Sequence, residues 1–232
     1  MKRFYKAVSV APGDGGFAVH LDGKPLKTPA RAPFALPNAA LAEAIAEEWR
    51  EQGEEIDMAS MPMTRLSFAA IDTVPSQRCA TIEHVLGFGR TDLVSYRAET
   101  PNALIARQAA SWDPLLEWLA QTYGARLAVT SGIRHVAQSE QSIAALENAA
   151  RALNDYELVA LHAATTITGS LTIALALIAG RITADEAFHA AHVDEHFQAE
   201  KWGRDEPAEA RRAGLRAELQ SAERFLKAIR CH

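Results

Sequence analysis

A run of twenty-two residues without a formal charge, from Leu158 to Ala179, constrains this chain more than any other feature. A run of that length could cross a bilayer as one helix. Its middle is polar, however, and contains His162, Thr165, Thr166, Thr168, Gly169, Ser170 and Thr172. The pair Gly169-Ser170 is typical of a break between two helices. We therefore predict two buried helices and no membrane insertion, while hydropathy alone leaves a membrane span as the alternative.

The first thirty residues have the alternation of β-strands. Alternating apolar residues predict a strand from Phe17 to Leu21. The pair Asp22-Gly23 comes next and favours a two-residue hairpin, because both positions must accept a positive φ. Pro25 and Pro29 place the following run at the edge of a sheet, where a missing N–H breaks no ladder bond. We therefore assign structural roles to Gly23 and Pro29.

Helical periodicity takes over after this start. The expected helices cover residues 37–52, 62–72, 75–88, 101–123, 140–153, 155–168, 170–179, 183–202 and 207–230. Asp113-Pro114 is expected to end one helix and cap the next. Thr183 and Glu186 have the spacing of a capping box. The predicted fold class is therefore α+β, with a small β-rich domain with flanking helices (residues 1–95) followed by a larger, mostly α-helical domain (residues 96–232).

Charge and cysteine content narrow the functional classes. The chain of 232 residues has 24 Lys and Arg against 29 Asp and Glu, a net charge of −5. That is the wrong sign for a protein that binds nucleic acid by neutralising phosphates. Cys79 and Cys231 lie far apart, which predicts neither a disulfide framework nor a structural zinc site and favours a reducing compartment. The N-terminus has no apolar segment of the kind that marks a protein for export.

One segment, HVDEH at residues 192–196, matches the H-x-x-E-H pattern of inverted zinc peptidases. On a single helix the two histidines would share a face. A catalytic zinc needs three protein ligands and an open position, and no downstream acidic residue stands out as the third ligand. A solvated polar helix face explains the segment, and a zinc-dependent hydrolase that uses this helix is the alternative.

Acidic residues gather in two places. Glu43, Glu47 and Glu51 repeat at i, i+4 on one helical stripe, where like charges oppose the helix. A solvated outer face explains this stripe, and a basic partner is the alternative. The second group lies on the helix expected after Gly180 and contains Asp185, Asp194, Glu195 and Glu200.

Sequence blocks along nearly the whole chain resemble a known family. In the N-terminal half they are residues 3–5 (RFY), 21–29 (LDGKPLKTP), 44–49 (AIAEEW) and 61–64 (MPMT). Further on they are Asp92, residues 96–98 (YRA), 112–114 (WDP) and 168–170 (TGS), and then Asp194, Glu195, Gln198, Glu200, Trp202, Gly203 and Asp205. These blocks resemble the ATP12-type assembly chaperones, which bind the free α subunit of F-type ATP synthase.

The resemblance implies a small β domain followed by a helical domain, with no catalysis, no metal and no cofactor. It implies a protein client, the ATP synthase α subunit, and a bacterial cytoplasmic setting. The residues that it assigns to partner contact are Asp185, Asp194, Glu195, Glu200 and Trp202. Trp49 is expected to support the helix that it ends. On this view Asp185→Lys weakens capture of the α subunit and leaves the fold unchanged.

Overall fold

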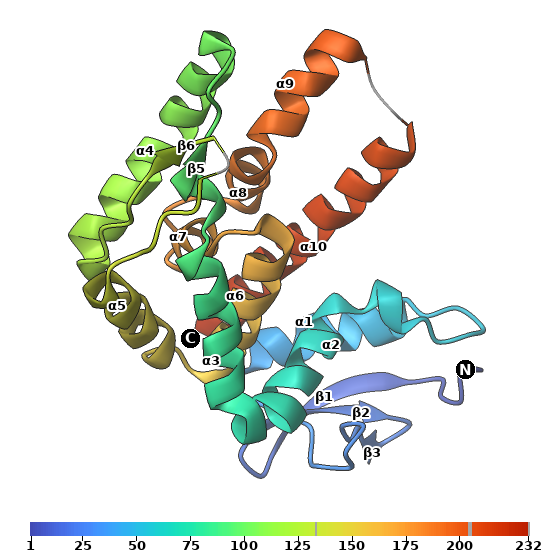
Figure 1. Cartoon of the computed structure of the whole chain (residues 1–232). Helices are drawn as coiled ribbons and strands as arrows, with labels where there is room; N and C mark the ends of the chain where they lie inside the picture. Colours follow the sequence, from blue (N-terminus) through green and yellow to red (C-terminus); the bar gives the residue numbers. More distant parts are fainter. Residues whose placement is uncertain (133, 204–205, 232) are drawn as a thin grey trace. The chain divides into compact units, whose positions relative to one another are not determined.

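The computed structural model describes residues 1–132, 134–203 and 206–231. Its fold class is α+β, as predicted, with short strands near the N-terminus and helices over most of the remainder (Figure 1). The chain divides into a strand unit, made of Met1–Arg78, Asp155–Ala160 and Ser221–His232, and a helical unit, made of Cys79–Asn154 and Leu161–Gln220. This division does not coincide with the domain boundary expected between residues 95 and 96. That boundary stays a prediction.

A small antiparallel sheet forms from four short strands: β1 (Val8–Gly13), β2 (Gly16–Leu21), β3 (Lys24–Pro25) and β4 (Ala35–Leu36). Strand β2 pairs with each of the other three. The predicted hairpin joins β2 to β3, and Asp22 (φ 48°) and Gly23 (φ 77°) both have a positive φ. Strand β3 has two residues and ends at Pro25, so Pro25 lies in a short edge strand. Pro29 lies beyond β3, in an exposed turn.

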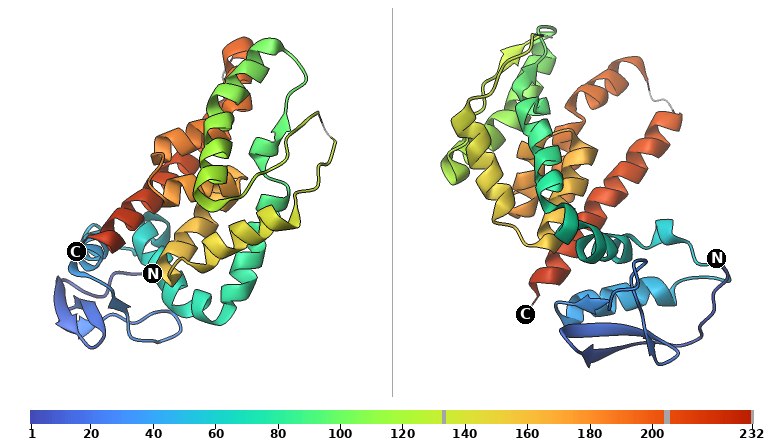
Figure 2. Two further views of the ribbon diagram at one scale, coloured as in Figure 1. Left: turned by 90° about the vertical axis from the view of Figure 1, so that its left-hand side faces the viewer. Right: turned by 60° about the horizontal axis from the view of Figure 1, so that its bottom comes forward.

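Helix α1 (Ala39–Arg50) packs on this sheet (Figures 1 and 2). Asn38 caps the helix by accepting a 2.9 Å hydrogen bond from the amide of Leu41. The apolar side of the helix is buried and ends in Trp49. The Tyr5 hydroxyl donates to the Trp49 carbonyl oxygen over 2.7 Å, and the two rings lie 5.6 Å apart. Trp49 therefore connects the N-terminal segment to the end of α1.

The chain continues through a 3-10 turn (Met58–Ser60), α2 (Pro62–Phe68), a π-helical turn (Ala69–Thr73) and α3 (Val74–Arg90). The residue before α2, Met61, has no side chain that can cap the helix. Glu48 of α1 supplies the cap instead, because it accepts hydrogen bonds from the amides of Met63 (2.7 Å) and Thr64 (2.8 Å). Burial raises the pKa of the Glu48 carboxyl, and these hydrogen bonds oppose the rise. One half-buried acid thus fixes α2 against α1.

The position of Trp49 gives a first prediction. Trp49→Arg should lower the free energy of unfolding by at least about 3 kcal/mol, because it replaces a buried ring with a charge that has no partner. Trp49→Phe is the matched control. It keeps the apolar contact and removes an indole N–H that has no acceptor among the described residues, so the loss should stay below about 1.5 kcal/mol. Urea unfolding curves measure both, and equal stability of the arginine variant and wild type would contradict the assignment.

The helical unit contains α4 (Asn102–Tyr123), α5 (Glu140–Arg151), α7 (Leu171–Ile178), α8 (Ala184–Ala191) and α9 (Val193–Trp202), with parts of α3, α6 (Asp155–Thr168) and α10 (Glu206–Arg230). It also holds a 3-10 turn (Leu93–Ser95) and a parallel pair of two-residue strands, β5 (Tyr96–Arg97) and β6 (Thr130–Ser131).

Two helix boundaries predicted from the sequence are wrong. Helix α4 does not end at Asp113-Pro114 but runs through Pro114. Trp112 and Leu115 on either side of the proline are buried, whereas Pro114 is exposed, so packing holds the helix across the missing N–H. The helix expected over residues 183–202 is broken at His192 (φ −121°, ψ 30°) into α8 and α9. The capping box at the start of α8 is present as predicted.

The uncharged run folds as predicted into two helices, α6 and α7, which meet at Gly169 (φ 67°). Every residue of α7 is buried. Among the described residues, none of the helices combines the length and the hydropathy that crossing a membrane would need.

A buried carboxylate, Asp92, completes the start of α7. It accepts hydrogen bonds from the amide and the hydroxyl of Thr172, each over 2.9 Å, and from the hydroxyl of Ser170. Ser170 in turn caps α7 by accepting from the amide of Ile173 over 3.1 Å. Because no water reaches this helix end, its free amides depend on these two side chains.

We expect Asp92→Ala to lower the free energy of unfolding by roughly 2–4 kcal/mol, because several buried donors lose their acceptor. Asp92→Asn keeps one oxygen and should cost about half of that. Burial raises the pKa of Asp92 in the folded state. The folded chain therefore holds this proton at pH values where the unfolded chain has lost it. The contribution of Asp92 to the free energy of unfolding consequently falls as the pH rises from 3.8 through the folded pKa. Chemical unfolding from pH 3 to 7 tests this, since the asparagine variant should lack that slope.

Candidate functional site

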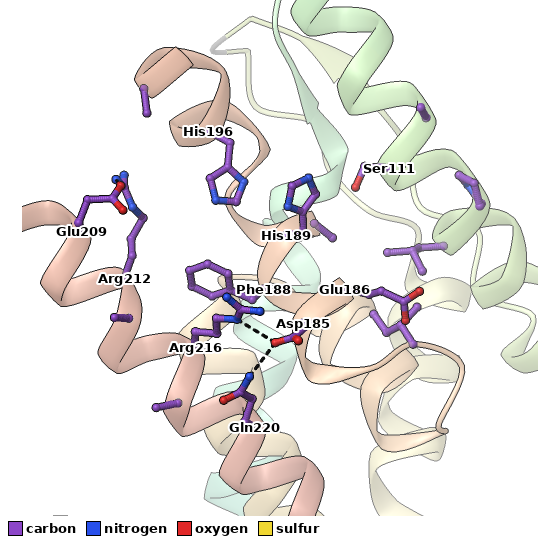
Figure 3. Close-up of a pocket in the computed structure, with 18 of the residues that line it drawn as sticks. Ser111, Asp185, Glu186, Phe188, His189, His196, Glu209, Arg212, Arg216 and Gln220 are labelled. Atoms are coloured by element: carbon purple, nitrogen blue, oxygen red, sulfur yellow. Dashed lines mark hydrogen bonds and ion pairs between the residues drawn. The ribbon is translucent and has the colours of Figure 1, made fainter. Parts of the chain in front are cut away.

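A groove of about 1080 Å³ in the helical unit is lined by residues of α4, α8, α9 and α10 (Figure 3). Its apolar lining includes Leu115, Phe188 and Ala213. Two of the five residues predicted to contact a partner, Asp185 and Glu200, also line it. The predicted partner-contact site therefore overlaps this groove at two residues.

Asp185 lies in the first turn of α8 and is bound by α10. Arg216 Nε and Gln220 Nε2 each donate to Asp185 Oδ1 over 2.8 Å (Figure 3). These two donors, Arg216 first, lower the pKa of Asp185 to about 2. The ion pair is half-exposed, with side-chain exposures of 52% for Asp185 and 51% for Arg216, so it is of the weak surface kind. Asp185 Oδ2 takes no part in either bond.

Two more of the predicted acids are held by α4. Both carboxylate oxygens of Glu200 accept from the Arg107 guanidinium, at 2.8 and 2.6 Å. This pairing lowers the pKa of Glu200. Asp194 accepts from Gln108 Nε2 over 2.7 Å through one oxygen. Both acids therefore help to fix α9 beside α4.

The other two predicted residues face outward. Glu195 is exposed and makes no hydrogen bond or ion pair within the described part of the chain. Trp202 ends α9 with 78% of its surface exposed, the largest exposed fraction among the large apolar side chains described. Asp205, which belongs to the blocks that carry the family resemblance, lies outside the described residues.

The HVDEH segment does not form the arrangement that a zinc hydrolase requires. The chain breaks at His192, whose ring is buried, stacks on Phe188 at 4.2 Å and lies with Nδ1 2.9 Å from the Phe188 carbonyl oxygen. The rings of His192 and His196 are 6.5 Å apart. No group of three or more metal-binding side chains occurs in the described ranges. The pattern reflects the α8–α9 junction and not a metal centre.

The acidic stripe of α1 is partly neutralised from within its own helix. Arg50 donates to Glu43 over 2.6 Å and to Glu47 over 2.9 Å. Glu51 is the residue that caps the end of α1. These contacts fit a solvated outer face, and contact with a basic partner stays a prediction that the structure leaves untested.

The partners of the acidic residues are not evident from the sequence. Arg107, Arg216 and Gln220 are far from Glu200 and Asp185 in sequence and belong to no motif. One local signal was available, since Arg212, Arg216 and Gln220 lie on one side of α10 at helical spacing. That spacing shows which residues share a face, but not which helix the face meets.

Comparison with solved structures places the chain among chaperones. Atp12 from Paracoccus denitrificans is 44% identical, with a TM-score of 0.93 over 99% of this chain and 98% of that one. An aspartate-to-lysine mutant of P. denitrificans Atp12p gives 43% identity and the same TM-score over the same shares. The Atu1473 protein of Agrobacterium tumefaciens, a putative chaperone, is 42% identical, with a TM-score of 0.94 over 99% of this chain and 86% of that one.

Sequence comparison gives the family. The family model described as ATP12 chaperone protein matches residues 2–120. The mitochondrial protein atp12 of Schizosaccharomyces pombe is 25% identical over 220 residues, which are 89% of this chain and 75% of that protein. The chain therefore belongs to the ATP12 chaperone family, whose members are ATP synthase assembly chaperones and not enzymes. The zinc-dependent hydrolase considered from the sequence is thereby excluded.

The contact between Asp185 and α10 gives a prediction about dynamics. Asp185→Asn should leave the thermal midpoint unchanged, because an exposed ion pair contributes little to stability. The same variant should speed amide hydrogen exchange a few-fold over residues 206–218. None of these residues is buried, so this part of α10 has little packing to hold it once the contact with Asp185 is weakened. Glu218→Gln, which changes an exposed acid on α10, is the control. Unchanged exchange in the Asp185 variant would show that other contacts hold this part of α10.

Proposed function

We propose that this protein binds the unassembled α subunit of F-type ATP synthase and prevents its aggregation during assembly of the catalytic sector. The observation that carries the proposal is the similarity to Atp12 of P. denitrificans at 44% identity across 99% of this chain. A subunit that awaits its neighbours exposes apolar surface that the finished complex covers, and such surface drives aggregation. A chaperone suppresses it by binding that surface and releasing it on assembly.

Trp202 and Glu195 are the residues of α9 that we propose for direct contact with the client. Aromatic side chains supply much of the binding energy of protein interfaces, and the ring of Trp202 is exposed in the described part of the chain. Glu195 offers a carboxylate that is not already engaged by a described residue. A charge at the rim of such an interface mainly increases the association rate and selects the partner.

Asp185, Asp194 and Glu200 belong to the same proposed surface, but each is already hydrogen-bonded within the chain. Asp185 and Asp194 each keep one oxygen outside the bonds described, and a carboxylate oxygen accepts more than one hydrogen bond. Each of the two therefore has an oxygen that can accept a hydrogen bond from a client. Glu200 uses both oxygens on Arg107, so we assign it to positioning α9.

We propose a bacterial cytoplasmic setting for this activity. The chain is 42–44% identical to the chains from two bacteria, P. denitrificans and A. tumefaciens, and 25% identical to the mitochondrial relative. This difference favours a bacterial version of the family.

The proposal is tested by diluting denatured α subunit into buffer with and without this protein and following light scattering. Wild type should suppress scattering at about equal molar ratio and co-elute with the α subunit from a sizing column. Trp202→Ser should weaken capture by about tenfold or more, as expected for an exposed aromatic anchor. Phe4→Ser is the matched control, because Phe4 is an exposed aromatic of the strand unit, 64% exposed.

Two outcomes would contradict the proposal. Scattering that is unchanged by wild-type protein would exclude the α subunit as client. Equal losses from Trp202→Ser and Phe4→Ser, with circular dichroism unchanged, would remove Trp202 from the contact surface while leaving the client assignment in place.

A further inference from the structure

The first half of α10 forms a wall of the groove without being buried itself. All residues from 206 to 218 are described, and none of them is buried, whereas burial begins at Leu219. Figure 3 shows this part of α10 facing α8 across the groove. The side that lines the groove carries Glu209, Arg212, Ala213, Arg216, Ala217 and Gln220. The side of α10 that lines the groove is therefore accessible to another helix.

The groove has the size of a short helix. A helix about 10 Å across that rises 1.5 Å per residue fills roughly 120 Å³ per residue. The groove volume of about 1080 Å³ therefore leaves room for a short helical segment. Small side chains on opposite walls, Ala199 of α9 and Ala213 and Ala217 of α10, allow the close approach that helix packing requires.

The groove lining carries both signs of charge, the acids Asp185, Glu186, Glu200 and Glu209 and the arginines Arg181, Arg212 and Arg216. Glu200 is paired with Arg107 and Glu186 caps α8, so Asp185 is the acid of α8 and α9 that can meet a basic residue of another helix. One basic side chain on a helix already docks there, because Arg216 of α10 donates to Asp185 over 2.8 Å. That ion pair is half-exposed, so a competing cation can replace it at little cost. The chain thus shows by its own contact that Asp185 accepts a basic residue presented by a helix.

We propose that the groove binds an amphipathic helix of the client, with a basic residue of that helix taking the place of Arg216 at Asp185. The proposal rests on the proposed function and specifies the client element that is recognised. The apolar side of the helix packs on Pro114, Ile182 and Ala217, which line the groove and are not buried, and its basic residue meets Asp185. Arg216 occupies this position in the free chaperone and keeps Asp185 paired until a client arrives.

A steric variant tests occupancy of the groove. Ala213 is exposed and lines the groove, so Ala213→Trp fills the space without disturbing a packed core. It should reduce capture of the α subunit at least about tenfold. Gly214→Trp is the matched control, since a side chain built at Gly214 meets nothing within 4 Å and the residue does not line the groove. Circular dichroism and the thermal midpoint should match wild type for both variants.

A charge variant tests the exchange at Asp185. The probes are two synthetic amphipathic helical peptides that share their apolar face and carry lysine or glutamate at the polar positions. Arg216→Ala should tighten binding of the lysine peptide about threefold at low salt, because it removes the internal competitor. Asp185→Asn should weaken that binding, and Arg211→Ala, which changes an exposed arginine outside the groove lining, should leave it unchanged. The lysine peptide should bind better than the glutamate peptide in every variant that keeps Asp185.

The outcomes separate this inference from the proposed function. Capture of the α subunit by Ala213→Trp at the wild-type level would overturn the groove as docking site and leave the proposed function intact. Preference for the glutamate peptide, or weaker binding of the lysine peptide by Arg216→Ala, would overturn the exchange at Asp185. Failure of wild type to capture the α subunit, with tight binding of the lysine peptide, would overturn the client and keep the groove.

Discussion

The helical unit depends on the satisfaction of one buried helix end. Every residue of helix α7 is buried, so the free amides of its first turn need acceptors inside the protein. Asp92 and Ser170 provide them, and the hydroxyl and the amide of Thr172 are bound by the same carboxylate. An apolar helix can therefore lie at the centre of the unit, where α4 and α8 pack against it. The groove walls on α4 and α8 are positioned by this arrangement.

Local sequence signals predicted the features that are set by local chemistry. Asp22-Gly23 specifies its turn because few other pairs accept a positive φ at both positions. Gly169-Ser170 and the capping box at Thr183 mark helix ends through backbone geometry and hydrogen bonds within a few residues. Such signals require no knowledge of the tertiary structure.

The features that the sequence did not reveal depend on contacts between distant residues. Pro114 stays within α4 because Trp112 and Leu115 are buried on either side of it, and Trp112 also donates to the Ala190 carbonyl oxygen over 2.7 Å. The break at His192 follows from packing on Phe188. The sequence pointed to the acids of the site through a family resemblance, but it did not show that Asp185, Asp194 and Glu200 are already bound by α10 and α4. Three of the four carboxylates that the resemblance assigned to a partner thus already have an internal donor.

The four tryptophans of the chain differ in their contact with water. Trp49 and Trp112 are buried, Trp118 is half-buried against Tyr123, and Trp202 alone is exposed. An indole in water emits at longer wavelength than one in an apolar interior, and a dissolved quencher reaches it first. The red edge of the intrinsic fluorescence thus belongs to one side chain at the tip of α9. If a client covers Trp202, the fluorescence emission of the unlabelled protein should shift to shorter wavelength and become less sensitive to a dissolved quencher.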